Sequence, residues 1–167
     1  MSAPNLFLSG VIEGFYGRPW PWRIRLAYAD YLQQLGLNTY LYCPKEDSRL
    51  RKRWREDWAQ AEWAELQALS RAYRERGLVW GIGLSPFALY RDYGAAERRA
   101  LRAKVERLQE LRPALLAILF DDMPGEQPDL AGRQAEIVAD VCHWAPQVQV
   151  LVCPTYYSYD PVLPRYF

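Results

Sequence analysis

The sequence has few of the residues on which several common chemistries depend. It contains one histidine, His143, and no Gly-x-Ser-x-Gly segment, so a Ser-His-Asp triad is not indicated. Its three cysteines form no Cys-x-x-Cys pair, which supports neither a zinc site nor a disulfide framework. No glycine-rich phosphate-binding motif follows the first predicted strand. We therefore expect neither a bound metal nor a cofactor.

An excess of one charge and a long apolar run are also missing. The 21 Lys and Arg residues nearly balance the 20 Asp and Glu residues, which leaves a net charge of +1. This charge is too small for a protein that binds nucleic acid by neutralising phosphates. No stretch approaches the roughly 18 apolar residues of a membrane span, and the N-terminal segment does not have the pattern of a signal peptide. We expect a cytoplasmic protein without a nucleic-acid or membrane partner.

Much of the basic charge lies in one short segment that acidic residues flank. The basic residues are Arg49, Arg51, Lys52, Arg53 and Arg55. A solvated surface loop held by salt bridges is the first interpretation of such a run. A patch for an acidic ligand is the second.

Short β-type runs alternate with amphipathic helical segments along the whole chain. The predicted strands are Leu6–Ile12, Asn38–Cys43, Leu78–Leu84, Ala114–Phe120 and Val148–Cys153, and the predicted helices are Trp22–Leu35, Trp58–Arg76, Ala95–Leu111 and Leu130–Trp144. This alternation predicts an α/β fold with parallel strands and right-handed crossovers. A five-stranded doubly wound open sheet suits the length of 167 residues. A (β/α)8 barrel has the same alternation but typically needs roughly 250 residues.

In either architecture the functional residues are expected directly after the strands. Those positions are Glu13–Trp20, Pro44–Asp47, Ser85–Phe87, Asp121–Asp122 and Pro154–Tyr159. They contain several acids, one lysine and many aromatic side chains. Aromatic faces and hydroxyls at strand ends favour a site for a neutral polyol such as a sugar ring.

The most informative local feature is the pair Asp121 and Asp122 after an apolar strand. Two carboxylates this close resist simultaneous ionisation, so we expect their pKa values to separate, with one group protonated near neutral pH. Such a pair suits glycoside cleavage. Binding of Mg²⁺ or Ca²⁺ and a structural turn cap remain open as alternatives.

Four blocks in order resemble the signature segments of glycoside hydrolase family 84. They are GVIEGFYGRPW from Gly10 to Trp20, LNTYLYCPK from Leu37 to Lys45, LFDDM from Leu119 to Met123, and CPTYY from Cys153 to Tyr157. That family contains O-GlcNAcases and bacterial β-N-acetylglucosaminidases, some once called hyaluronidases. The resemblance covers essentially the whole chain.

The resemblance implies a (β/α)8 TIM barrel, of which this chain would form the N-terminal portion. Residues 1–167 would then be a single incomplete domain with about five of the eight βα units. Further sugar-binding residues of the family follow strands six to eight, beyond this chain. Open sheet edges would also make a homo-oligomer possible.

The resemblance further implies retaining, substrate-assisted hydrolysis of β-linked N-acetylglucosamine in a glycan or glycoprotein. The sugar's own acetamido oxygen acts as the nucleophile and closes an oxazoline, so no cofactor is implied. Asp121 would orient the acetamido group and stabilise the oxazoline, and Asp122 would be the general acid and base. A truncated, inactive carbohydrate-binding or interaction module is the alternative function.

The same resemblance indicates four substrate-binding residues. Gly14 would contact the sugar through its backbone, Tyr16 would line the pocket, Lys45 would bind a ring hydroxyl, and Tyr157 would lie near the acetamido group. Three of the four also have a purely structural interpretation. Gly14 could be a turn glycine, Lys45 could form a salt bridge with a neighbouring acid, and Tyr157 could be a packed aromatic residue.

Overall fold

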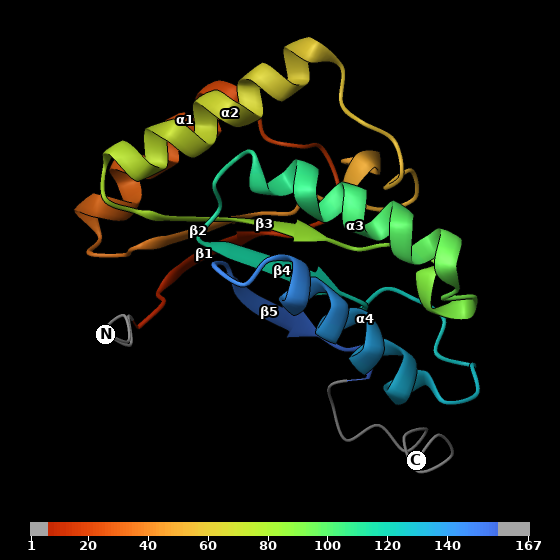
Figure 1. Ribbon diagram of the computed structural model, residues 1–167. Helices are drawn as coiled ribbons and strands as arrows, with labels where there is room; N and C mark the ends of the chain where they lie inside the picture. Colours follow the sequence, from red (N-terminus) through yellow and green to blue (C-terminus); the bar gives the residue numbers. More distant parts are fainter. Residues whose placement is uncertain (1–6, 157–167) are drawn as a thin grey trace.

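The computed structural model describes residues 7–156, which form a five-stranded parallel sheet and four α-helices in alternation (Figure 1). The strands are β1 (Gly10–Glu13), β2 (Thr39–Tyr42), β3 (Val79–Leu84), β4 (Leu115–Leu119) and β5 (Gln149–Cys153). The helices are α1 (Trp22–Gln34), α2 (Gln60–Glu75), α3 (Ala95–Gln109) and α4 (Leu130–Trp144). None of these described helices is long and apolar enough to cross a membrane.

The order of the strands distinguishes the two predicted architectures. The strands lie side by side as β1-β2-β3-β4-β5, and each neighbouring pair is parallel. A doubly wound sheet reverses its strand order at a switch point, and this sheet does not reverse. The doubly wound alternative is therefore wrong. The α/β fold has the strand order of a (β/α)8 barrel over the five strands described.

One face of the sheet packs against all four helices and forms the main hydrophobic core. Alternate strand residues point to this face, as the period of two in a β-strand requires. The strand residues of this core are Tyr40, Tyr42, Trp80, Ile82, Leu84, Leu116, Ile118 and Phe120. Helices end where the sequence allows a left-handed residue, since Gly36 and Gly77 after α1 and α2 have φ angles of 69° and 70°.

The opposite face of the sheet carries a smaller cluster that passes over two glycines of β3. Leu41 and Cys43 of β2 cluster with Ala117 of β4, although β3 lies between these strands. This contact is possible because β3 has Gly81 and Gly83 there. A Cβ atom added to Gly83 would lie 2.5 Å from the Cβ of Cys43. The glycines therefore let side chains from β2 and β4 meet across β3.

The predicted elements are all present, but some of their ends differ from the prediction. The first strand begins only at Gly10, because the Asn38 side chain accepts a hydrogen bond from the backbone N–H of Ser9 (2.9 Å) and donates one to the carbonyl of Phe7 (2.7 Å). Helix α2 begins at Gln60 and not at Trp58. Two short 3₁₀ helices, η1 (Ser48–Leu50) and η2 (Leu89–Arg91), were not predicted.

We predict that Gly83→Ala lowers the free energy of unfolding by about 1–3 kcal/mol, the usual cost of overpacking a core. The new methyl group would meet a Cβ atom that can move only with its backbone. Urea unfolding would measure the loss. In a Cys43→Gly background the clash is absent, so the double variant should lose less than the sum of the two single variants. Strict additivity would contradict this role of Gly83.

Candidate active site

Polar side chains from three segments meet at the carboxyl edge of the sheet. Tyr16 follows β1, Lys45 follows β2, and Asp121 and Asp122 follow β4. All strands are parallel, so their carboxyl ends lie at one edge, where barrel enzymes place their active sites. The structure thus brings together four of the six residues that the sequence singled out.

The ammonium group of Lys45 lies between the two carboxylates. Its Nζ is 2.9 Å from Oδ2 of Asp121 and 2.6 Å from Oδ2 of Asp122. Lys45 is buried, and burial alone would lower its pKa, but the hydrogen bonds and charges of both aspartates raise the pKa above its usual value. Lys45 therefore stays protonated and compensates both negative charges. The sequence left open a salt bridge of Lys45 to Glu46 or Asp47, but the salt bridges of Lys45 are to Asp121 and Asp122.

Tyr16 supplies a second donor to the same oxygen of Asp122. Its hydroxyl donates to Oδ2 of Asp122 at 2.6 Å, and 60% of the Tyr16 side chain remains exposed. This hydrogen bond is the main cause that raises the pKa of Tyr16.

The pKa of Asp122 differs from the expectation for an adjacent acid pair. Burial would raise this pKa, but the hydrogen bonds from Lys45 and Tyr16 and the positive charges of Lys45 and Arg51 together lower it below its ordinary value. The sequence predicted that one acid of the pair is held protonated. For Asp122 in the free site this is wrong, because the lysine between the carboxylates removes the repulsion on which the prediction rested.

Asp121 retains one oxygen for a further donor. Its Oδ2 accepts from Lys45, while its Oδ1 is buried and has no hydrogen-bond partner among the described residues. Within residues 7–156 no group of three His, Cys, Asp or Glu side chains is arranged to hold a metal ion. The cation that the pair contacts is the ammonium of Lys45. A buried carboxylate oxygen without a donor is costly unless a ligand supplies one.

Glu13, which the sequence placed directly after the first strand, is the last residue of β1 and does not belong to the site. It points to the helix face and is completely buried, where Arg25 of α1 donates three hydrogen bonds to its carboxylate, the two shorter ones to Oε1 at 2.7 Å and to Oε2 at 2.9 Å. The hydroxyl of Tyr40 also donates to Glu13. This buried ion pair joins the end of β1 to α1 and so fixes both ends of the loop that carries Tyr16.

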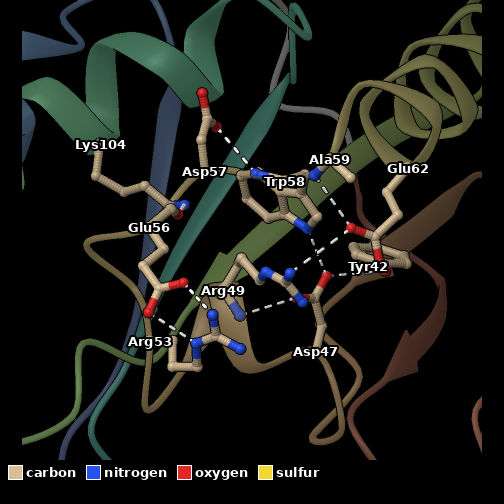
Figure 2. A network of polar contacts seen from close by, with 10 residues as sticks. All are labelled: Tyr42, Asp47, Arg49, Arg53, Glu56, Asp57, Trp58, Ala59, Glu62 and Lys104. Carbon is tan, nitrogen blue, oxygen red and sulfur yellow. Dashed lines mark hydrogen bonds and ion pairs between the residues drawn. The ribbon is translucent and has the colours of Figure 1, made fainter.

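The segment between β2 and α2, which carries Lys45, is held by Asp47 (Figure 2). Asp47 accepts hydrogen bonds from the backbone N–H of Arg49 at 3.0 Å, from the indole of Trp58 at 2.9 Å and from the hydroxyl of Tyr42 at 3.1 Å. Asp47 was among the strand-end acids of the sequence. Its three donors give it a structural role beside the site.

Arg51, on the same segment, is a site residue that the sequence reasoning did not identify. One guanidinium nitrogen is 3.4 Å from the hydroxyl of Tyr16, and the other is 3.3 Å from the carbonyl of Lys45. In the sequence Arg51 is one member of a basic run. Its position six residues after Lys45 indicates only that it lies near the strand ends. An irregular loop has no period from which the direction of the Arg51 side chain could be predicted.

The loop that carries the two aspartates is fixed by contacts from both neighbouring strands. Thr155, after β5, donates from its hydroxyl to the carbonyl of Phe120 at 2.8 Å. The hydroxyl of Tyr90, after β3, donates to the carbonyl of Pro124. Tyr156 packs directly against Gly125, where an added Cβ atom would lie 2.1 Å from its hydroxyl oxygen. Tyr90 and Tyr156 thus support the loop.

Two remaining predicted residues have different outcomes. Gly14 lies beside the site at the end of β1 and does not have the positive φ angle that would mark an obligatory turn glycine. A Cβ atom there would make only ordinary contacts, at 3.4 Å from Ile12 and 3.6 Å from Cys43. Tyr157 lies outside the described residues, so its predicted role is not tested.

Comparisons of the whole chain with known proteins give consistent results. A family model described as beta-N-acetylglucosaminidase matches residues 9–164. The protein O-GlcNAcases of Rattus norvegicus and Mus musculus are each 32% identical to the chain over 160 residues. A solved structure of a mutant O-GlcNAc hydrolase from Thermobaculum terrenum superposes with a TM-score of 0.84 at 28% identity.

The chain is short relative to these proteins. The alignment with the rodent proteins covers 90% of this chain but 18% of each relative. The bacterial structure is matched over 92% of this chain and 36% of its own length. The similarity therefore extends along nearly all of this chain.

We predict that Lys45→Met raises the pKa of Asp122, because the carboxylate loses a donor and a positive charge and faces Asp121 without compensation. Carboxyl ¹³C NMR titration of the aspartate-labelled chain would measure this, with Asp122→Asn to assign the signal. Lys52→Met removes an exposed lysine of the same segment and serves as the control. An unchanged midpoint in Lys45→Met would contradict the role of Lys45.

Proposed function

The chain belongs to the beta-N-acetylglucosaminidase family, and on this basis we propose that it contributes the catalytic groups for hydrolysis of β-linked N-acetylglucosamine in a glycan or glycoprotein. The observation that carries the proposal is the unequal environment of the two carboxylates. Asp121 has a buried oxygen without a donor among the described residues, and Asp122 beside it is exposed. The two groups are thus suited to different tasks.

Asp121 is suited to hold the acetamido group of the sugar. Its free Oδ1 accepts the acetamido N–H, which turns the acetamido carbonyl oxygen toward C1 of the same sugar. As that oxygen forms a bond to C1, positive charge develops on the acetamido group. The adjacent carboxylate of Asp121 stabilises this charge, so the sugar can act as its own nucleophile.

Asp122 is suited to transfer the proton. It donates a proton to the glycosidic oxygen while the C1–O bond breaks and its electron pair passes to the leaving oxygen. The resulting carboxylate then accepts a proton from the water that attacks C1 and opens the oxazoline. The configuration at C1 is retained after these two displacements.

Lys45 connects sugar binding with the protonation of Asp122. In the free site its ammonium and the Tyr16 hydroxyl keep the pKa of Asp122 low. When a sugar hydroxyl accepts a hydrogen bond from the Lys45 ammonium, Asp122 loses one of these stabilising groups. The bound sugar also displaces water from the Asp122 carboxyl group. Both changes raise the pKa of Asp122 and favour its acid form when substrate is present. Gly14 and Tyr16 line the side from which the sugar approaches.

We predict that Asp122→Ala lowers the release of 4-methylumbelliferone from its N-acetyl-β-glucosaminide by about 10²–10⁴-fold, the usual contribution of a general acid. The loss should be far smaller for the dinitrophenyl glycoside, whose leaving group needs no proton. Steady-state kinetics with both substrates would measure the two losses.

Asp30→Asn, which changes an exposed aspartate of α1 paired with Arg76, is the matched control and should keep the parental rates. Equal losses on the two substrates would contradict the acid role of Asp122. Binding of N-acetylglucosamine by the unchanged chain without release of either aglycone would favour the carbohydrate-binding module instead.

A further inference from the structure

The basic segment from Arg49 to Arg55 contains three paired arginines and one that faces the candidate active site. Arg53 is paired with Glu56, and Arg55 lies 3.6 Å from Glu97. Arg49 lies 3.9 Å from Glu62. These three form the solvated, salt-bridged surface that the sequence suggested. Arg51 instead has no carboxylate within salt-bridge distance among the described residues.

Arg51 contacts two residues that both donate to Asp122. Its guanidinium lies over the ring of Tyr16, 5.5 Å from the ring centroid, and 3.4 Å from the hydroxyl oxygen. A second nitrogen donates to the backbone carbonyl of Lys45 at 3.3 Å. The Tyr16 hydroxyl and the Lys45 ammonium both bind Oδ2 of Asp122. A single planar group therefore contacts both donors of one carboxylate oxygen.

We propose that Arg51 is a positioning residue that fixes Tyr16 and Lys45 as the two donors to Asp122 and thereby sets the protonation of that carboxyl group. This inference rests on the proposed function for the acid role of Asp122. Arg51 is not a catalytic residue in this proposal, since it acts through the two side chains that it holds.

The surroundings of Tyr16 explain why such a residue is needed. Tyr16 is exposed and lies in a loop without helix or strand, between β1 and α1. Its hydroxyl is the end of a side chain that could rotate into solvent at little cost. The guanidinium fork offers several N–H donors in one plane, so it can hold the hydroxyl and the Lys45 carbonyl at once. The guanidinium also lies over the Tyr16 ring, and this cation–π contact further stabilises the position of the ring.

The charged and titratable groups around Asp122 come from four segments of the chain. They are Tyr16 after β1, Lys45 and Arg51 after β2, Asp121 on the same loop, and Cys153 at the end of β5. The positive charge of Arg51 lowers the pKa of Asp122 directly, in addition to the effect of the two donors that Arg51 holds. Replacement of Arg51 by a neutral residue removes both influences, so the acid form of Asp122 becomes more favourable.

The first experiment follows the titration of Asp122 by carboxyl ¹³C NMR in the unchanged chain and in Arg51→Ala, Arg51→Lys and Arg53→Ala. We expect the midpoint of Asp122 to rise in Arg51→Ala and to be only partly restored in Arg51→Lys, which keeps the charge without the fork. Arg53→Ala, from an exposed surface pair, should titrate like the parent. Thermal unfolding of each variant shows that it is folded.

Two results of this titration would overturn the proposal. The first is the same Asp122 midpoint in the parent and in Arg51→Ala. The second is a parental midpoint in Arg51→Lys, because charge alone would then explain the effect. Tyr16→Phe adds a further criterion. If Arg51 acts through Tyr16, the double variant shifts Asp122 by less than the sum of the single shifts, and additive shifts would contradict the positioning role.

The second experiment measures the steady-state kinetics of substrate turnover and their pH dependence. We expect Arg51→Ala to lower kcat/KM about tenfold, mainly through kcat, because the Asp122 carboxyl group is less firmly positioned and its raised pKa makes it a weaker acid. The alkaline limb of kcat/KM should move to higher pH, because the general acid must be protonated and its pKa has risen. An unmoved limb would contradict the proposal. If the parent chain does not turn over substrate, the proposed function fails, and the NMR titration still decides the role of Arg51.

Discussion

The site depends on the compensation of two adjacent carboxylates by one ammonium group. Asp121 and Asp122 would repel each other at this separation, and Lys45 lies within 2.9 Å of both. Lys45 follows β2, whereas the acids follow β4, so the contact must pass over β3. It can do so because β3 has glycines on that face, and the Cys43 side chain of β2 reaches the β4 side there. The two glycines on this face of β3 thus allow the contact on which the charge balance of the site depends.

A second ion pair, on the other face of the same sheet edge, supports this arrangement. Glu13 and Arg25 are both buried, so neither charge is compensated by water. Breaking such a pair leaves one buried charge without a partner, which typically costs about 3–5 kcal/mol. The pair therefore holds the two ends of the Tyr16 loop against the helix layer. The loop between these ends remains exposed, and within it the position of Tyr16 is set by Asp122 and Arg51.

The sequence predicted the fold well where its signals were periodic. Alternating strands and amphipathic helices gave the α/β class, and the motif resemblance gave the barrel type, which the strand order supports. The same reasoning placed Lys45, Asp121 and Asp122 at one edge of the sheet. It could not predict that the ammonium lies between the acids, since this depends on side-chain distances across three strands. The protonation expected for Asp122 was wrong for the same reason.

The direction of a side chain at a strand end separates an acid buried against the helices from acids that face the candidate active site. Glu13 continues the alternation of β1 toward the helices, as Val11 does, and is buried with Arg25. Asp121 follows Phe120, which points into the helix core, so Asp121 points to the opposite face. Because successive strand residues point to opposite faces of the sheet, an acid at a strand end is directed either to the helices or to the candidate site. Lys45 and Arg51 lie in an irregular segment beyond any such period, so only tertiary contacts determine which of its cations enters the site.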